Sequence, residues 1–145
     1  MNITQLKNSV LLAAAAAAAG VGQLLGGWDE AIRVLIALMG ADYLTGMLLA
    51  LVWKRSPKSE SGALDSRAGF TGLIKKGMIL LVVWLGVLLD GALHTSYVRL
   101  AVILFFVGNE GLSLLENLGL MGVPFPGFLK NALEALREEG DNAKA

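Results

Sequence analysis

The sequence predicts an all-α membrane protein, with about four transmembrane helices arranged as two hairpins and a C-terminal amphipathic helix. Of its 145 residues, 55% are hydrophobic and 17% are charged, and the mean hydropathy is +0.64. A soluble domain of this size is about 45–50% apolar and about 25% charged. The apolar residues also gather in four blocks of about the 20 residues that a helix needs to cross a bilayer. The length fits a single domain over residues 1–145.

The first block, residues 9–27, is the weakest candidate span. Its alanine run at 13–19 contributes little transfer free energy, and Gln23 opposes insertion. Lys7 ahead of an apolar stretch is also typical of a secretory signal peptide. We interpret the block as an uncleaved, loosely held first helix, with the signal peptide as the alternative.

The other three blocks are stronger. Residues 31–53 hold ten Leu, Ile or Val residues and end at Trp53, an aromatic residue suited to the membrane interface. Residues 77–93 are dense in Leu and Val, and residues 97–115 begin apolar and turn polar in their second half. Only three residues separate the first block from the second, and again the third from the fourth. Each pair is therefore expected to form a helical hairpin.

The connection between the hairpins, residues 54–76, sets the orientation. It carries six basic residues against two acidic ones, and basic short loops mark the cytoplasmic side of a membrane. With four spans, Lys7 and the tail residues Lys130, Arg137 and Lys144 lie on that side too. We expect a bacterial cytoplasmic (inner) membrane protein with both termini in the cytoplasm. The Gly- and Ser-rich second half of the connection is interpreted as a flexible segment or a short interfacial helix.

The C-terminal tail reads as an amphipathic helix. Pro124 and Pro126 end the fourth span, and apolar residues then recur on one face of residues 127–139 with charged residues opposite. Such a helix is expected to lie on the inner membrane surface or on a partner helix.

One acidic residue falls near the middle of the second block. A charge at the bilayer centre costs about 2.5–3.5 kcal/mol, so Asp42 needs a partner or water. Gly46 and Ala50 follow it at i+4 and i+8, which makes a small, polar helix face that permits close approach. Asp42 is expected to face a subunit interface or a water-filled lumen. The alternative is a protonated Asp42 inside a single bundle, bonded to a hydroxyl or a carbonyl group.

A polar stripe marks the cytoplasmic half of the fourth block. Its members recur at helical spacing and are Asn109, Glu110, Ser113, Glu116 and Asn117. Facing lipid would be costly, so the stripe is a candidate for oligomer contacts or pore lining. Lys75 and Lys76 are expected as counter-charges for Glu116. Capping and snorkelling near the interface would explain Glu116 without any function, but explain the deeper Glu110 less well.

Catalytic and metal chemistry are not indicated. The sequence has no cysteine, one histidine, no phosphate-binding glycine loop and no metal-ligand spacing. It also lacks a basic face with aromatic residues for nucleic acid. We therefore expect no enzyme activity, no cofactor and no nucleic-acid partner. The histidine, His94, lies four residues after Asp90, and the two are expected to form a hydrogen-bonded pair.

Three stretches together resemble the toxin secretion/phage lysis holin family of small membrane proteins. They are Asp42-Tyr-Leu-Thr-Gly46, Ser66-x-x-Gly69-x-x-Gly72-x-x-Lys75-Lys76-Gly77, and Asn109-Glu110-x-x-Ser113-x-x-Glu116-Asn117. The last continues through Gly122-Val-Pro124-Phe-Pro126 into the tail. The resemblance covers about residues 30–137, in the family's order and spacing.

This resemblance implies a function. Holins accumulate in the cytoplasmic membrane and assemble as homo-oligomers into holes. A murein hydrolase (endolysin), or in some hosts a protein toxin, then crosses, and an antiholin is a further partner. The polar faces would be subunit contacts or would line the hole. Two alternatives stay open: a small ion channel or transporter that uses Asp42 and Glu110 as a relay, and a membrane-anchored scaffold that recruits a partner through its tail.

Overall fold

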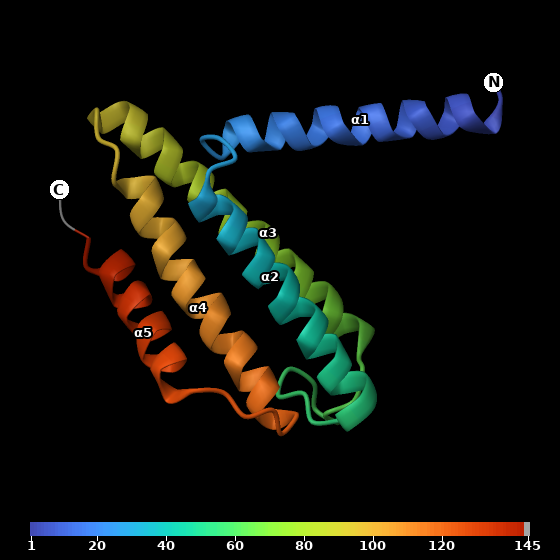
Figure 1. Ribbon diagram of the computed structural model, residues 1–145, viewed down its shortest axis with the longest axis vertical. Coiled ribbons are helices and arrows are strands. Elements are labelled where there is room, and N and C mark those ends of the chain that lie inside the picture. The colour runs from blue at the N-terminus through green and yellow to red at the C-terminus, as the bar shows by residue number, and fades with distance from the viewer. Residues whose placement is uncertain (144–145) are drawn as a thin grey trace.

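The computed structural model describes residues 1–143 and is helical throughout its regular structure, which confirms the all-α prediction. Residues 144 and 145, and with them Lys144, lie outside the described range. The elements are α1 (Ile3–Leu24), α2 (Glu30–Leu48) with a π-helical turn η1 (Leu49–Trp53), α3 (Ser66–Leu93), α4 (Val98–Leu120) and α5 (Gly127–Asp141). Figure 1 shows α2, α3 and α4 as a three-helix bundle, α5 alongside α4, and α1 leading away from one end.

Three of the described helices are long and apolar enough to cross a membrane: Glu30–Trp53, Ser66–Leu93 and Val98–Leu120. The predicted count of four spans is therefore not confirmed. Helix α1 is not among the three, and Gly22 is its single buried residue. Alanine adds little hydrophobic free energy, so this helix has little to gain from lipid or from the bundle. The cytoplasmic N-terminus depends on a fourth crossing and stays a prediction.

Two helices begin earlier than expected because of local capping. Helix α1 begins at Ile3 since Asn2 and Gln5 form a capping box: each side chain accepts a hydrogen bond from the other's backbone N–H, at 2.9 and 3.0 Å. Helix α3 begins at Ser66 because the Asp65 carboxylate accepts from the Arg67 N–H at 3.0 Å. The expected connection 54–76 is therefore irregular only as far as residue 65, and its second half is the first part of one continuous helix.

The early part of α3 is packed against α2. Gly69 and Gly72 lie beside the Tyr43 ring, and a Cβ atom on either would sit 3.6 Å from that side chain. The Tyr43 hydroxyl donates to the Gly69 carbonyl oxygen at 3.2 Å. These contacts explain why this Gly-rich stretch is a helix fixed to the bundle.

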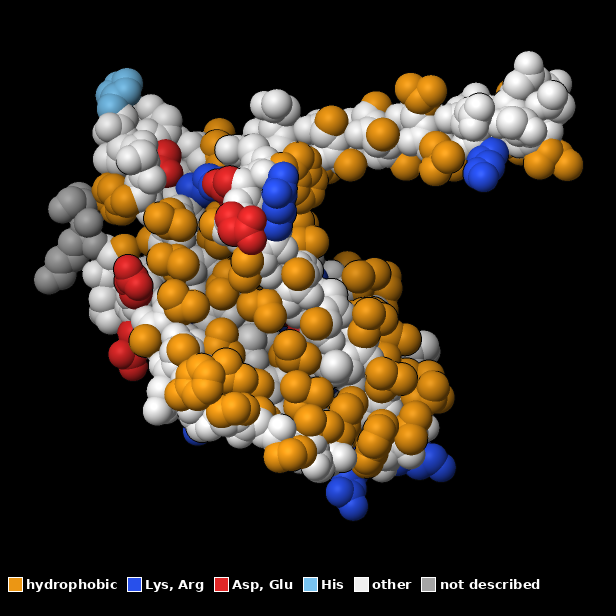
Figure 2. All heavy atoms as spheres, viewed as in Figure 1, with side chains coloured by type: hydrophobic (Ala, Val, Ile, Leu, Met, Phe, Trp, Pro, Cys, Tyr) orange, Lys and Arg blue, Asp and Glu red, His pale blue; other side chains and the backbone are white. Residues whose placement is uncertain are grey.

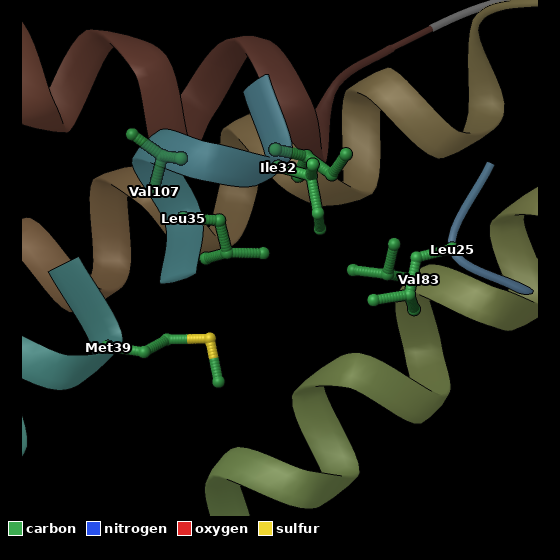
Figure 3. Packing of buried hydrophobic residues seen from close by; sticks show 7 residues of the cluster. Leu25, Ile32, Leu35, Met39, Val83 and Val107 are labelled. Carbon is green, nitrogen blue, oxygen red and sulfur yellow. The ribbon is translucent and has the colours of Figure 1, made fainter. Parts of the chain in front are cut away.

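The apolar core occupies the half of the bundle away from the 54–65 connection. It comes from the α1–α2 junction and from α2, α3 and α4 (Figure 3), and consists of Leu25, Ile32, Leu35, Met39, Val83, Ile103 and Val107. Four of these side chains are fully buried: Ile32, Leu35, Val83 and Ile103. The other half of the bundle interior contains the buried polar side chains Asp42, Glu110 and Asn117 beside Leu49 and Leu115, and it forms the candidate site.

In the turn between α3 and α4, Asp90 does not pair with His94 as predicted. Asp90 instead accepts from the Thr95 hydroxyl at 2.7 Å and from the backbone N–H groups of Val98 and Arg99 at 3.0 and 2.9 Å. These are free donors at the start of α4, which a carboxylate satisfies well. His94 ends α3 in the left-handed conformation, with φ 53°.

Arg99 joins α4 to the junction of α1 and α2. Its Nη1 lies 2.6 Å from Asp29 Oδ2, and its Nη2 donates to the Gly27 carbonyl oxygen at 3.1 Å. The backbone at Gly26 has φ 84°, and a Cβ atom there would sit 2.6 Å from Arg99 Nε, so a side chain would be excluded. The guanidinium therefore fixes where α1 leaves the bundle.

This junction should loosen in acid. The hydrogen bond from Arg99 lowers the pKa of Asp29 below its ordinary value of 3.8. A carboxyl group with a lowered pKa stabilises the folded contact above its ordinary pKa, and the contribution is lost as pH falls through the folded value. A nitroxide on Thr4→Cys should become more mobile below about pH 3.8. An Asp29→Asn chain should be mobile at every pH, and equal pH profiles for the two chains would contradict the prediction.

Candidate functional site

A cavity of about 500 Å³, lined by charged and apolar side chains, lies at the end of the bundle where α2 and α3 are connected. Its walls come from α2, the 54–65 connection, α3 and α4, with one residue from α5. The charged side chains that line it are Asp42, Lys58, Asp65, Lys75, Lys76, Glu110, Glu116 and Arg137. The cavity therefore combines four acidic and four basic groups, formally neutral as a set.

Three of these residues form a buried cluster, which we call the carboxylate–lysine cluster (Asp42, Lys76 and Glu110). Lys76 Nζ lies 2.7 Å from Asp42 Oδ2 and also pairs with Glu110 Oε2. Asp42 is 2% exposed and Glu110 is 6% exposed. Since the three residues come from α2, α3 and α4, the cluster ties the three spans together within the bundle.

A second cation lies close to the cluster. Lys58 Nζ, from the connection, is 3.8 Å from Asp42 Oδ2, and its side chain is half-exposed. Two carboxylates and one lysine would leave a net negative charge, so a second ammonium group nearby lowers the cost of burying them.

Asn117 completes the surroundings of Asp42. Its buried Nδ2 donates to Asp42 Oδ1 at 3.1 Å, to the Asp42 carbonyl oxygen at 3.2 Å and to Thr45 Oγ1 at 3.1 Å. Thr45 in turn donates to the Ala41 carbonyl oxygen at 2.8 Å. Within residues 1–143, every buried side-chain nitrogen or oxygen has a hydrogen-bond partner. The polar interior is therefore fully satisfied within one chain.

The structure brings the predicted site residues together. Seven of the eight line the cavity: Asp42, Gly46, Ala50, Asn109, Glu110, Ser113 and Glu116. The eighth, Asn117, is bonded to Asp42. Asn109 and Glu116 are exposed at the cavity, whereas Glu110, Asn117 and Asp42 are buried within one chain. For Asp42 this is the single-bundle location of the two that were weighed. Its partner is a lysine, however, and not the expected hydroxyl or carbonyl group.

The expected counter-charges are corrected. Lys76 pairs with Asp42 and Glu110, not with Glu116. Glu116 is exposed, and among the described residues neither it nor Lys75 forms an ion pair. The deeper carboxylates gain more from a buried cation because they are further from water.

Sequence reasoning missed several residues of the site, among them Thr45, Lys58 and Arg137. Thr45 could have been found, since it lies three residues after Asp42 and so shares its helix face. Lys58 lies in an irregular connection, where no periodicity indicates direction. Arg137 reaches the cavity because α5 folds back along α4, which the local pattern of the tail does not determine.

The chemistry available at this site is that of a charged helix contact. Within residues 1–143, no three Asp, Glu or His side chains are grouped so that they could hold a metal ion. The geometry provides a contact between three membrane helices in which buried carboxylates are paired with lysines, beside a cavity large enough for water.

Comparison with known proteins gives consistent matches. A family model described as "Bacteriophage holin family" matches residues 19–138. An uncharacterized protein of Clostridium perfringens strain 13 is 36% identical over 120 residues, which cover 81% of this chain and 83% of the relative. An uncharacterized protein of Halalkalibacterium halodurans is 34% identical over 137 residues, 90% of this chain and 94% of the relative. A probable holin of Bacillus phage phi105 is 29% identical over 111 residues, 76% of each chain. No solved structure matches.

Proposed function

This chain belongs to the bacteriophage holin family, and we propose that it oligomerises in the cytoplasmic membrane to open holes for a murein hydrolase (endolysin). The same hole would also pass a protein toxin, because a hole wide enough for a folded enzyme does not select among folded proteins. The observation that carries the proposal is the family match over residues 19–138, which includes all three candidate spans.

The structure supports the membrane part of this proposal. The face of the bundle shown in Figure 2 presents mostly hydrophobic side chains, and the buried carboxylates Asp42 and Glu110 are paired with Lys76 inside. The two buried carboxylates therefore meet a cation and not lipid, so the three spans can lie in the bilayer before the chain assembles. We propose that the eight predicted site residues keep the three spans together as one unit, and that this unit contributes the subunit contacts.

The test is inducible expression in a bacterial cell, with and without a murein hydrolase that has no export signal of its own. We expect abrupt loss of optical density only when an active hydrolase is present, because the hydrolase must reach the wall through the hole. A catalytically inactive hydrolase is the matched control. Depolarisation with no hydrolase release would contradict the proposal.

A second candidate is a small ion channel or transporter. The observation that favours it is the cavity of about 500 Å³ with buried Asp42 and Glu110 at its wall. It would give saturable or ion-selective flux with no passage of proteins, and Asp42→Asn or Glu110→Gln would reduce that flux. The same expression experiment separates the two candidates, because only the holin releases the hydrolase.

A further inference from the structure

The cavity at the connection end of the bundle is open between α2 and α3. These two helices each pack along α4, whereas they contact each other at only a few positions. Tyr43 and Met47 line the cavity from α2, and Thr71 and Gly72 line it from α3. Met47 and Thr71 are also exposed at the surface of the bundle. The cavity can therefore be entered from the side, between two membrane spans.

The opening lies near the depth of the lipid headgroups. Trp53, an aromatic residue suited to the membrane interface, ends the α2 span, and the exposed basic residues Lys54 and Arg55 follow it. Figure 2 shows basic side chains at the same end of the molecule. Most of the α3 residues that line the cavity lie at 68–76, before the apolar block that begins at residue 77. A lipid in this leaflet therefore has its headgroup beside the cavity.

Charges of both signs remain at the cavity without an ionic partner. Outside the carboxylate–lysine cluster, Lys75, Arg137 and Glu116 line the cavity, and none of the three forms an ion pair among residues 1–143. Arg137 is half-buried beside the middle of α4, since a Cβ atom on Gly108 would lie 2.6 Å from its backbone nitrogen. A guanidinium group at that position along a span needs water or an anion.

These three groups match a zwitterion better than an anion. Lys75 and Arg137 offer an ammonium and a guanidinium group, which are the usual protein ligands of phosphate. The Glu116 carboxylate offers an acceptor for an ammonium group on the ligand. The charged residues of the whole cavity are formally neutral, four acidic and four basic. A ligand with a net negative charge therefore gains less there than a ligand that carries both signs.

The apolar part of the lining suits the chains of a lipid. Met47, Ile79 and Leu112 line the cavity beside its charged groups. Ile79 belongs to the apolar block of α3, and Met47 is exposed at the opening. The volume of about 500 Å³ is within the roughly 300–1,000 Å³ of small-molecule sites. The cavity therefore has room for a headgroup and has an apolar path from it toward the bilayer.

We propose that this cavity binds the headgroup of one zwitterionic phospholipid with a free ammonium group, phosphatidylethanolamine. The phosphate lies at Lys75 and Arg137, and the ammonium group lies at Glu116. The acyl chains leave between α2 and α3, past Met47 and Ile79. This inference goes beyond the proposed function and needs only that the three spans lie in a bilayer, so a chain that opens no hole would still bind the lipid.

The test is native mass spectrometry of the full-length chain in a mild detergent, with one phospholipid added at a time. The lipids are phosphatidylethanolamine, phosphatidylcholine and phosphatidylglycerol with identical acyl chains. We expect one phosphatidylethanolamine per chain, bound about tenfold more tightly than either of the others, because each of them lacks one charge-assisted hydrogen bond. Phosphatidylcholine has no N–H donor on its ammonium group, and phosphatidylglycerol has no ammonium group.

Two variants separate the two ends of the headgroup. Glu116→Gln should bind phosphatidylethanolamine and phosphatidylcholine almost equally, because the ammonium group loses its carboxylate. Arg137→Gln should bind both lipids about tenfold more weakly than the wild type, because the phosphate loses the guanidinium group. The matched controls are Glu60→Gln and Arg55→Gln, which change exposed residues of the connection outside the cavity lining and should bind as the wild type does.

The comparison of lipids on the wild-type chain does not depend on any variant. Equal binding of the three lipids would mean that they only coat the spans, and tighter binding of phosphatidylglycerol would mean an anion site. Either result overturns the inference. Phosphoethanolamine, the headgroup without acyl chains, is added as a competitor. If it displaces the lipid at equal concentration, the ligand is a soluble phosphate ester and the lipid assignment is wrong.

Discussion

Replacing Lys76 with methionine should cost the chain about 3–5 kcal/mol of folding free energy, because it leaves two buried carboxylates without their shared cation. Lys76 bridges Asp42 and Glu110, and both carboxylates are nearly inaccessible to solvent. Methionine has a similar length and fills the same space, so the loss is electrostatic rather than steric. The measurement is the midpoint of denaturant-induced unfolding of the purified chain in detergent micelles.

Two controls isolate this effect. Lys75→Met changes the adjacent lysine, which lines the cavity without an ion pair among the described residues, and should leave the midpoint almost unchanged. The triple variant Lys76→Met/Asp42→Asn/Glu110→Gln removes all three charges and should recover much of the loss, because no unpaired charge remains. Equal midpoints for the Lys75 and Lys76 variants would show that the cluster does not stabilise the bundle.

Gly108→Ala should release α5 from α4. The added methyl group would meet the Leu133 carbonyl oxygen at 2.5 Å and the Arg137 backbone nitrogen at 2.6 Å. Backbone atoms cannot turn aside as a side-chain end can, so the overlap should weaken the contact by about 1–3 kcal/mol. Amide hydrogen exchange of α5 in lipid nanodiscs should then become about tenfold faster or more.

Gly119→Ala is the matched control on the same helix. Its Cβ atom would find only Phe125 Cε1, at the ordinary distance of 3.9 Å. Alanine favours a helix over glycine by about 0.5–1 kcal/mol, so this variant should keep or increase protection. If both variants left α5 exchange unchanged, the close contact between α4 and α5 would be absent in lipid.

The sequence predicted the three strong spans well because their signal is local. An apolar run of about 20 residues needs no knowledge of neighbours to indicate a membrane helix, and the blocks 31–53, 77–93 and 97–115 overlap α2 with η1, α3 and α4. Helix ends were less predictable. Asn2 and Asp65 each cap the start of a helix by accepting a backbone hydrogen bond, and the mean hydropathy of an apolar block does not detect such a cap.

The predicted polar residues were gathered into one site, but the partners within it were assigned wrongly. Periodicity places Asp42 and Glu110 on polar faces of their helices, since it depends only on spacing along one helix. It could not show that Lys76 reaches both, because that depends on how α3 is rotated between α2 and α4. For the same reason Lys75, one residue away, was an equally good candidate.

The sequence by itself determined that this is a helical membrane protein, which segments are apolar, and which polar residues need a partner or water. Those properties follow from the free energy of moving each residue into lipid, a sum over local composition. Only the tertiary structure decided that α1 leaves the bundle, that Lys76 joins two carboxylates, and that α5 lies along α4. These depend on which surfaces fit closely enough to exclude lipid and bring opposite charges into contact, and such fits join residues far apart in the chain.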